Sequence, residues 1–370
     1  MASECCYVRT FFLTILNLQK LILIAQIIIP LQAFSSSSPG IHHHINSKAN
    51  KLKQLCLDAR SKKKTIILPG IYDSLSAKIF ADTGAKVLFL SGFGVSASKL
   101  GQPDIGILTQ TEMEDTLRSV VQVVSSHGTP VIVDGDTGYG EIMNIRRTIR
   151  NFAAAGAAAI TIEDQSFPKK CTYAAGMGVK VVSFNECRTR IKAAIAARNE
   201  ARSIDGNDVL IVARTDCRAA LGLDEAIRRC KMFEEEGADI CYAENLQSKQ
   251  EYEYLKAMLH QSTLTMLAQV QLQNRMNEFA EDLILEQTLF NAEEISDMGF
   301  DLALFGVTPL QAIVQTLTNV ATNMLDTNNG LVDEKIDFST FFHLKKVVGF
   351  NEADIFASLH GSDNEIKGSE

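Results

Sequence analysis

The sequence has no excess of basic residues and no paired-cysteine motif. Across 370 residues, 36 Lys and Arg are outnumbered by 44 Asp and Glu, which gives a net charge of −8. This balance argues against a nucleic-acid partner, which would require a basic face. The eight cysteines form no C-x-x-C pair. Their spacing favours reduced thiols in a non-secreted enzyme over a disulfide framework.

The N-terminal region also has few acidic residues and no long unbroken apolar run. Residues 1–57 contain one acid, Glu4, and the apolar stretch at 11–34 is interrupted by Asn17, Gln19 and Lys20. The unbroken runs are too short to span a bilayer comfortably. We expect residues 1–48 to be an organelle presequence, with the chloroplast favoured, and keep a secretory signal or membrane anchor as the alternative.

Eight short apolar runs follow, and amphipathic segments with helical periodicity separate them. Runs this apolar indicate parallel strands buried on both faces. No G-x-G-x-x-G follows the first run, which disfavours a doubly wound dinucleotide-binding sheet. The sequence therefore predicts an α/β fold, a (β/α)₈ barrel over residues 49–330, with a helical extension at 331–370. The runs lie at 65–71, 86–92, 130–136, 158–164, 209–216, 239–245, 264–270 and 301–307.

Acidic residues gather where these runs end, and this is where a barrel of this kind carries its active site. If residues 130–136 form a strand, Asp134 and Asp136 point to the same face and repel each other unless a cation lies between them. Together with Glu163, from the next run, they form an all-oxygen set suited to Mg²⁺ or Mn²⁺. Asp104 is an ordinary turn residue or an acid that reaches the metal's waters. The alternative is that one aspartate caps the following helix.

The turn "SGFG" follows the second run. Its Ser91, and the backbone amides of Gly92 and Phe93, suit a carboxylate or a phosphate, although the motif taken alone favours a plain turn.

A long glycine-bearing segment at 163–183 is typical of an active-site lid. Within it, Cys171 follows two lysines, Lys169 and Lys170, which predicts a lowered thiol pKa and a role as acid or base. Packing alone is the alternative. Arg214 ends a buried strand, where we expect it to pair with an anionic substrate or with Glu244.

The strings "SGFG", "GQPDIG", "VDGDTGYG", "IEDQSFPKKC" and "VARTD" occur in this order. From about residue 50 onward the chain resembles the isocitrate lyase/phosphoenolpyruvate mutase superfamily and, within it, the plant carboxyvinyl-carboxyphosphonate phosphorylmutase-like proteins. The resemblance implies a barrel whose C-terminal helices are swapped between the subunits of a homodimer, usually within a homotetramer. It also implies Mg²⁺ and a small anionic 2-oxo or 2-hydroxy acid that reacts through an enolate-like intermediate.

The resemblance also assigns roles to the residues singled out above. Asp134 matches the direct metal ligand, and Asp136, Glu163 and Asp104 match acids that hold the metal's waters. Ser91, Gly92, Phe93 and Arg214 match substrate-binding groups, and Glu244 matches an acid near the substrate. Lys169 and Cys171 match the lid lysine and the general acid/base of the lyases. Phosphonate mutases carry asparagine where Cys171 stands.

The chain departs from the family pattern in the lid. Lyases read K-[KR]-C-G-H, whereas this sequence reads "KKCTY", with Thr172 and Tyr173 in the last two positions. A β-branched Thr172 is strained if the glycine it replaces has a positive φ. Gln269 stands in place of an asparagine, and an insertion, 272–287, follows it.

The function expected from these features is Mg²⁺-dependent cleavage of a C–C bond in a small 2-oxo or 2-hydroxy (di)carboxylate. A phosphonate-forming mutase and a non-catalytic relative with an altered lid are the alternatives.

Overall fold

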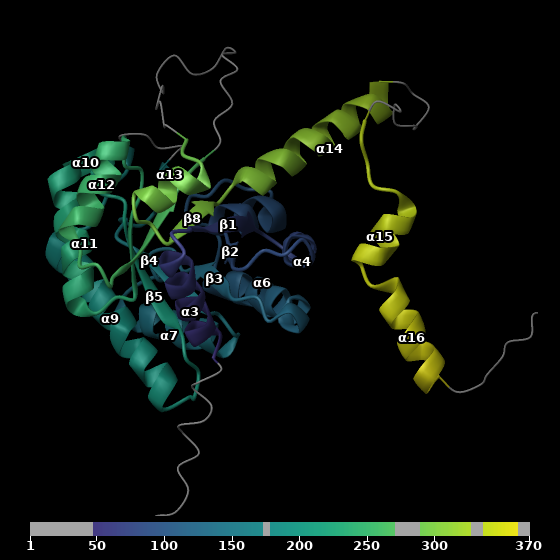
Figure 1. Cartoon of the computed structure of the whole chain (residues 1–370), viewed down its shortest axis with the longest axis horizontal. Coiled ribbons are helices and arrows are strands. Elements are labelled where there is room, and N and C mark those ends of the chain that lie inside the picture. Colours follow the sequence, from purple (N-terminus) through teal and green to yellow (C-terminus); the bar gives the residue numbers. More distant parts are fainter. Residues whose placement is uncertain (1–46, 173–177, 271–288, 327–335, 362–370) are drawn as a thin grey trace, which may run out of the picture. The chain divides into compact units, whose positions relative to one another are not determined.

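Eight parallel strands close into a single barrel in the order of the sequence, as the eight apolar runs predict (Figure 1). The computed structural model describes residues 47–172, 178–270, 289–326 and 336–361. The chain divides into two units, Met1–His43 and His44–Glu370, and every described residue lies in the second. Most of the expected leader, 1–48, therefore lies outside the described residues. The strands are β1 (Ile66–Ile71), β2 (Leu88–Leu90), β3 (Val131–Asp134), β4 (Ala159–Glu163), β5 (Leu210–Thr215), β6 (Ile240–Ala243), β7 (Leu264–Ala268) and β8 (Leu302–Phe305).

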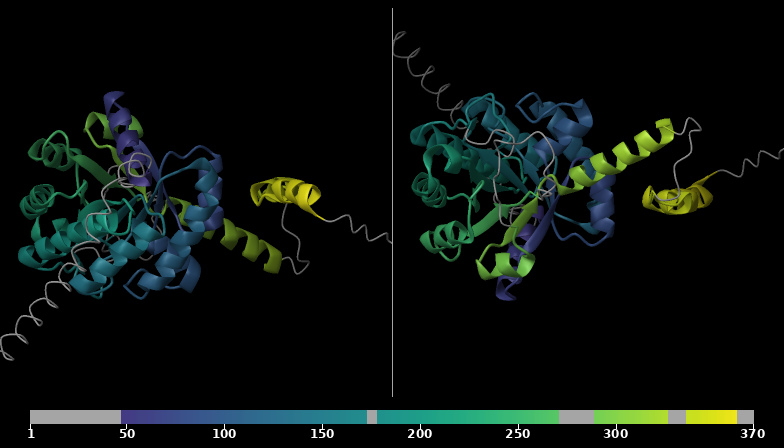
Figure 2. Two further views of the ribbon diagram at one scale, coloured as in Figure 1. Left: turned by 90° about the horizontal axis from the view of Figure 1, so that it is seen from below. Right: turned by 90° about the horizontal axis from the view of Figure 1, so that it is seen from above.

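The helices that connect successive strands surround the barrel, as both views in Figure 2 show. The helices are α3 (Lys48–Ser61), α4 (Ser74–Asp82), α5 (Gly92–Val95), α6 (Gln110–Val123), α7 (Ile142–Ala154), α9 (Phe184–Ser203), α10 (Arg218–Leu221), α11 (Leu223–Glu236), α12 (Lys249–Met258), α13 (Ala292–Asp297), α14 (Thr308–Asp326), α15 (Phe341–Val347) and α16 (Phe350–His360). None of the described helices is long and apolar enough to span a membrane.

Most strand residues are apolar because both faces of the strands are largely covered, and the charged strand residues lie at or near the C-terminal ends. One set of side chains fills the barrel interior, including Leu68, Ile132, Val212 and Met266. The alternate set packs against the surrounding helices, which bury their own apolar stripes there. This two-layer core is the reason why the strands contain no period-2 polar pattern.

Helix α3 closes the N-terminal end of the barrel. Its Leu52 and Cys56 join the interior cluster. Arg60 donates to Asp301, just before β8, with Nη2 2.7 Å from Oδ2. The Lys51 ammonium donates to the carbonyl of Gly128, just before β3. The opposite end, where the strands terminate, is left for the functional site.

Strand β3 is shorter than the sequence suggests. It ends at Asp134, and Asp136 has a left-handed φ of 48° beyond the strand. The expectation that strand alternation places Asp134 and Asp136 on one face is therefore wrong. The chain turns at Gly135, where a Cβ would lie 2.5 Å from the carbonyl oxygen of Thr161 on β4. Only glycine permits this close backbone approach.

Candidate active site

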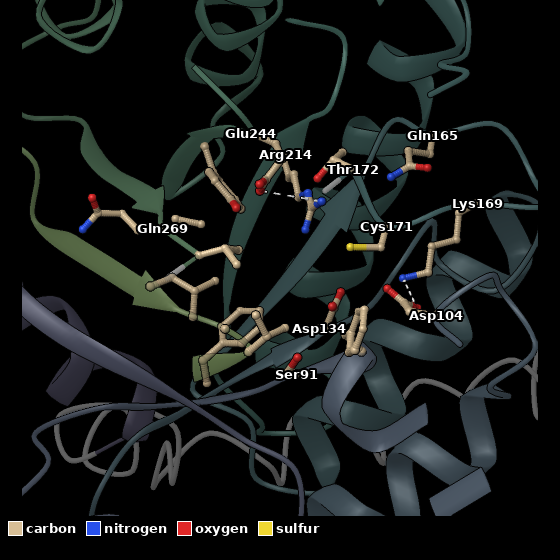
Figure 3. A pocket seen from close by; sticks show the side chains of 18 residues that line it. Ser91, Asp104, Asp134, Gln165, Lys169, Cys171, Thr172, Arg214, Glu244 and Gln269 are labelled. Carbon is tan, nitrogen blue, oxygen red and sulfur yellow. Dashed lines mark ion pairs between the residues drawn. The ribbon is translucent and has the colours of Figure 1, made fainter. Parts of the chain in front are cut away.

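A small cavity opens at the C-terminal ends of the strands, the position predicted for an active site (Figure 3). It encloses about 70 Å³, room for a few waters or a small organic acid. Residues in or just after β2, β3, β5, β6, β7 and β8 line it, and the loops that follow β2 and β4 complete the lining. The predicted site residues that line the cavity are Ser91, Phe93, Asp104, Asp134, Lys169, Cys171, Arg214 and Glu244. Asp136 and Glu163 lie immediately behind this lining and pair with its two cations.

Asp134 is fixed by two backbone amides. Its Oδ1 accepts from the N–H of Asp136 at 3.0 Å, and its Oδ2 accepts from the N–H of Gly92 at 3.2 Å. The carboxylate is 6% exposed, and no side-chain cation neutralises it directly in the described contacts. These two N–H bonds fix the orientation of the Asp134 carboxyl group at the cavity.

Lys169 lies between two carboxylates. Its Nζ is 2.7 Å from Oδ1 of Asp104 and also pairs with Asp136. All three side chains are nearly buried. Burial raises the pKa of Asp136 to about 7, and the Lys169 charge opposes that rise. Burial acts to lower the pKa of Lys169, but Asp136 and Glu163 outweigh it and hold the pKa well above its usual value. Lys169 is therefore a charged ammonium that holds the two loops together.

Arg214 is shared by three acids. Its Nη2 lies 2.8 Å from Oδ1 of Asp216 and 3.7 Å from Oε2 of Glu244, and its Nε lies 3.5 Å from Oε2 of Glu163. Burial raises the pKa of Glu163 well above its usual value, against the pull of Arg214. The expected pairing with Glu244 is present, but Asp216 is the nearer partner.

The turn after β2 was expected to bind a ligand through Ser91 and two backbone amides, but two of these groups make hydrogen bonds within the protein. The Ser91 hydroxyl caps α5 by accepting from the N–H of Gly94 at 3.2 Å. The Gly92 amide donates to Asp134, so that N–H is already used within the protein. A side chain at Gly92 would lie 2.9 Å from Oδ2 of Asp134. The glycine therefore shapes the acidic end of the cavity, and Phe93 contributes an aromatic wall.

Cys171 reaches the cavity from the segment after β4. Its N–H donates to the carbonyl of Asp104 at 3.2 Å, and its thiol is half-buried. The neighbouring Lys170 N–H donates to Oε1 of Gln165 at 2.9 Å. These two backbone contacts fix the start of the segment. Residues 173–177, including Tyr173, lie outside the described residues, as does the 272–287 insertion.

The acids of the site do not form a three-ligand cluster among the described residues. The sequence led us to expect Asp134, Asp136 and Glu163 around one cation, whereas Asp136 pairs with Lys169 and Glu163 with Arg214. The donor set nevertheless suits a hard divalent cation. Oε1 of Glu163 is buried and has no hydrogen-bond partner in the described chain. Among the described residues, six carboxylates lie around two cations, Lys169 and Arg214; the acids are Asp104, Asp134, Asp136, Glu163, Asp216 and Glu244.

Three functional residues were not assigned from the sequence. Asp216 lies two residues after Arg214. Because side chains two residues apart on a strand point to the same face, this spacing could have indicated that Asp216 lies beside Arg214. Gln165 lines the cavity and donates from Nε2 to Oδ2 of Asp216 at 3.3 Å. Thr172 was noted only as a departure, yet its side chain lines the cavity. It is not among the described non-glycine residues with positive φ, so the strain considered for it does not arise.

Gln269 also lines the cavity, but its amide is occupied. Nε2 donates to the carbonyl of Phe290 at 2.9 Å, and Oε1 accepts from the Phe290 N–H at 2.7 Å. This residue therefore holds the segments on either side of the insertion together.

Comparison with known proteins places the chain among enzymes that act on small carboxylates. The chain is 32% identical to 2,3-dimethylmalate lyase of Eubacterium barkeri over 308 residues, covering 83% of this chain and 96% of the lyase. It is 34% identical to the chloroplastic carboxyvinyl-carboxyphosphonate phosphorylmutase of Arabidopsis thaliana, and the match covers 80% of this chain and 78% of that protein. The fold matches a solved structure of oxaloacetate acetylhydrolase in complex with the inhibitor 3,3-difluorooxalacetate. The TM-score is 0.74 and the sequence identity is 30%, over 86% of this chain and 99% of the hydrolase.

A family model described as phosphoenolpyruvate phosphomutase matches residues 57–325, which include the whole barrel and its acidic cavity. The chain is thus an enzyme of the phosphoenolpyruvate phosphomutase family, within the superfamily that also contains isocitrate lyase.

Proposed function

We propose that this enzyme cleaves a C–C bond in a small 2-oxo or 2-hydroxy (di)carboxylate in the presence of Mg²⁺, through an enolate-like intermediate. The observation that carries the proposal is a single cavity in which a thiol, Cys171, meets an excess of buried carboxylates. The identity with a lyase over most of both chains supports the same class of reaction.

Asp134 would bind the ion, with Asp136, Glu163 and Asp104 around it, and Mn²⁺ has the ligand preferences to replace Mg²⁺. When bound, the ion supplies positive charge that stabilises an enolate. Arg214, held by Asp216 and Glu244, presents a guanidinium to the carboxylate of the substrate. Lys169 keeps the loops after β2 and β4 closed over the cavity.

The proton transfer is assigned to Cys171. In a 2-hydroxy acid, cleavage between C2 and C3 turns the C2 hydroxyl into a carbonyl and passes its proton to a carboxylate of the cavity. The electron pair of the broken bond remains on C3 as an enolate. The Cys171 thiol, which lines the cavity, protonates that carbon.

The experiment that tests this function is a screen of purified full-length protein with Mg²⁺ against alkylmalates, oxaloacetate and phosphonopyruvate. Cleavage of a malate or of oxaloacetate, with release of two smaller acids, supports the lyase. Conversion of phosphonopyruvate instead would favour a phosphonate mutase, the second candidate, which the Arabidopsis relative's name supports. Turnover of none of them, with a ligand retained at the site, favours a non-catalytic relative.

We also propose that a second copy of this chain covers the C-terminal helices, in a homodimer or homotetramer. Helices α14, α15 and α16 expose many large apolar side chains. Water-exposed apolar surface of this extent is typical of an interface. The most exposed apolar side chains of these three helices, each at least 67% exposed, are Leu325, Phe341, Phe342, Phe356 and Leu359.

For the N-terminal region we propose import into an organelle, with the chloroplast favoured over secretion or anchoring. The scarcity of acids in residues 1–57 supports this, and so does the chloroplastic designation of the Arabidopsis relative. Sequencing the mature N-terminus of protein isolated from its source tests it, because an imported chain begins after the leader.

A further inference from the structure

The hydroxyl of Thr172 is buried at the wall of the cavity without a partner. The residue is 2% exposed, and its Oγ1 has no hydrogen-bond partner in the described part of the chain. An unsatisfied buried hydroxyl is unfavourable, and a threonine that served only to fill space is replaceable by the isosteric valine. Such a group is therefore a candidate for contact with a ligand.

Other polar groups of the cavity are used within the protein. The Ser91 oxygen accepts from Gly94, the amide of Gln269 bonds to the backbone of Phe290, and Gln165 bonds to Lys170 and Asp216. Thr172 is also among the residues that line the cavity, but it differs from these three because its Oγ1 makes no such contact within the described part of the chain.

The surroundings indicate what the hydroxyl binds. Thr172 lies on the side of the cavity that holds Arg214 and Glu244 (Figure 3). Another part of the lining is apolar and offers no hydrogen-bonding side chain; it consists of Ala268, Val270, Leu304 and Val307. An anionic oxygen of a substrate is therefore favoured beside Arg214, where a hydroxyl donor and a guanidinium lie together.

We propose that Thr172 is a specificity-determining residue that donates its hydroxyl hydrogen to the second carboxylate of a dicarboxylic 2-oxo or 2-hydroxy acid. The inference rests on the proposed function for the position of the substrate and deepens it, because it selects diacids over acids with an alkyl group at that end. Loss of one hydrogen bond to a charged group weakens binding about tenfold or more.

The test compares binding of malate and 2-hydroxybutyrate, which differ in whether a carboxylate or a methyl group lies at the distal end. Titration calorimetry is performed on the full chain with Mg²⁺, for the wild type, Thr172→Val and Thr172→Ser. We expect Thr172→Val to weaken malate binding about tenfold while changing 2-hydroxybutyrate binding less than about twofold. Thr172→Ser, which keeps the hydroxyl, is expected to retain the preference.

The thermal midpoint provides a readout that does not depend on activity. Thr172→Val is expected to unfold at the same temperature as the wild type or higher, because it removes a buried hydroxyl that has no partner. The proposal is overturned if Thr172→Val weakens the binding of both acids equally or changes the binding of neither. It is also overturned if the wild type binds neither acid. Absence of lyase activity in the wild type, with the malate preference intact, overturns the proposed function alone.

Discussion

Arg229 donates from Nη1 to Oδ2 of Asp164 over 2.8 Å, and both side chains are 1% exposed. Asp164 follows β4 directly, and its Oδ1 also accepts from the backbone N–H of Asp216 at 2.9 Å. Asp216 in turn holds Arg214. The buried pair therefore positions the cavity arginine from behind the barrel wall, without itself lining the cavity.

Breaking this pair is expected to destabilise the protein strongly. Arg229→Met leaves the Asp164 carboxylate buried without its cation, which costs about 3–5 kcal/mol in the free energy of unfolding. Urea denaturation of the wild type and the variant measures this difference in the free energy of unfolding. The matched control is Arg228→Met, whose side chain is 59% exposed, with an expected cost within about 1 kcal/mol. Equal stability of the two variants would contradict a structural role for the Arg229–Asp164 pair.

Gly135 is expected to tolerate no side chain. Because a Cβ there would lie 2.5 Å from the Thr161 carbonyl oxygen, Gly135→Ala must move β3 relative to β4. We expect a loss of about 1–3 kcal/mol in unfolding free energy. Gly178→Ala is the control, since a Cβ at Gly178 meets nothing within 4 Å among the described residues, and the change should alter stability by less than about 0.5 kcal/mol. Wild-type stability of Gly135→Ala would show that the strands adjust freely.

The fold was predictable from the sequence because its signal is repeated. Each of the eight apolar runs contains one strand of the closed barrel, and a strand covered on both faces requires such a run. The grouping of Asp134, Arg214 and Glu244 around one cavity was predictable for the same reason, because parallel strands end together.

The partners within the site were not predictable. Lys169 reaches Asp136 only because the loop after β4 folds back over the strand ends, and loop geometry has no periodic signal. The strand end at Asp134 depends on the contact of Gly135 with β4, which lies in another part of the sequence. Strand alternation therefore led to the expectation that Asp134 and Asp136 share one face, and the left-handed conformation of Asp136 shows that it was wrong.

Replacing Cys171 is expected to abolish turnover and spare the fold. If its thiol donates the proton to the enolate, Cys171→Ala should lower kcat about 10²–10⁴-fold. Steady-state kinetics on the substrate found by the screen measures this. Cys56→Ala is the control, because Cys56 is a buried thiol on α3 at the other end of the barrel, so it should affect stability and leave kcat unchanged. Full activity of Cys171→Ala would refute the proton-transfer role.

Binding of Mg²⁺ is expected to change the pH dependence of stability. Burial raises the pKa of both Asp136 and Glu163 in the folded protein. Their stabilising contribution is therefore complete below the unfolded-state pKa and is lost as the pH rises through the folded-state pKa, which is about 7 for Asp136. Metal-free protein should lose stability as the pH rises from about 4, the usual carboxyl pKa, to about 7. Saturating Mg²⁺ should remove much of this loss, because a cation favours the ionised acids.

Thermal denaturation with and without Mg²⁺ across this range checks the expectation. Glu163→Gln should weaken the Mg²⁺-dependent rise in melting temperature, whereas Asp205→Asn, which alters an exposed pair with Arg150, should leave it unchanged. A melting temperature that is independent of Mg²⁺ at every pH would exclude a metal site among these carboxylates.

The exposed C-terminal helices give a prediction about assembly. Phe342 on α15 is 76% exposed, and a charge at this position would be buried in an interface between two copies of the chain. Phe342→Asp should therefore shift the protein toward a smaller species, because burying an unpaired carboxylate is costly. Light scattering coupled to size-exclusion chromatography measures the molar mass. Asn351→Asp on α16 adds the same charge at another exposed position and separates the loss of an apolar contact from a general charge effect. A wild-type mass equal to one chain, 40.6 kDa, would show that no second copy covers α15 and α16.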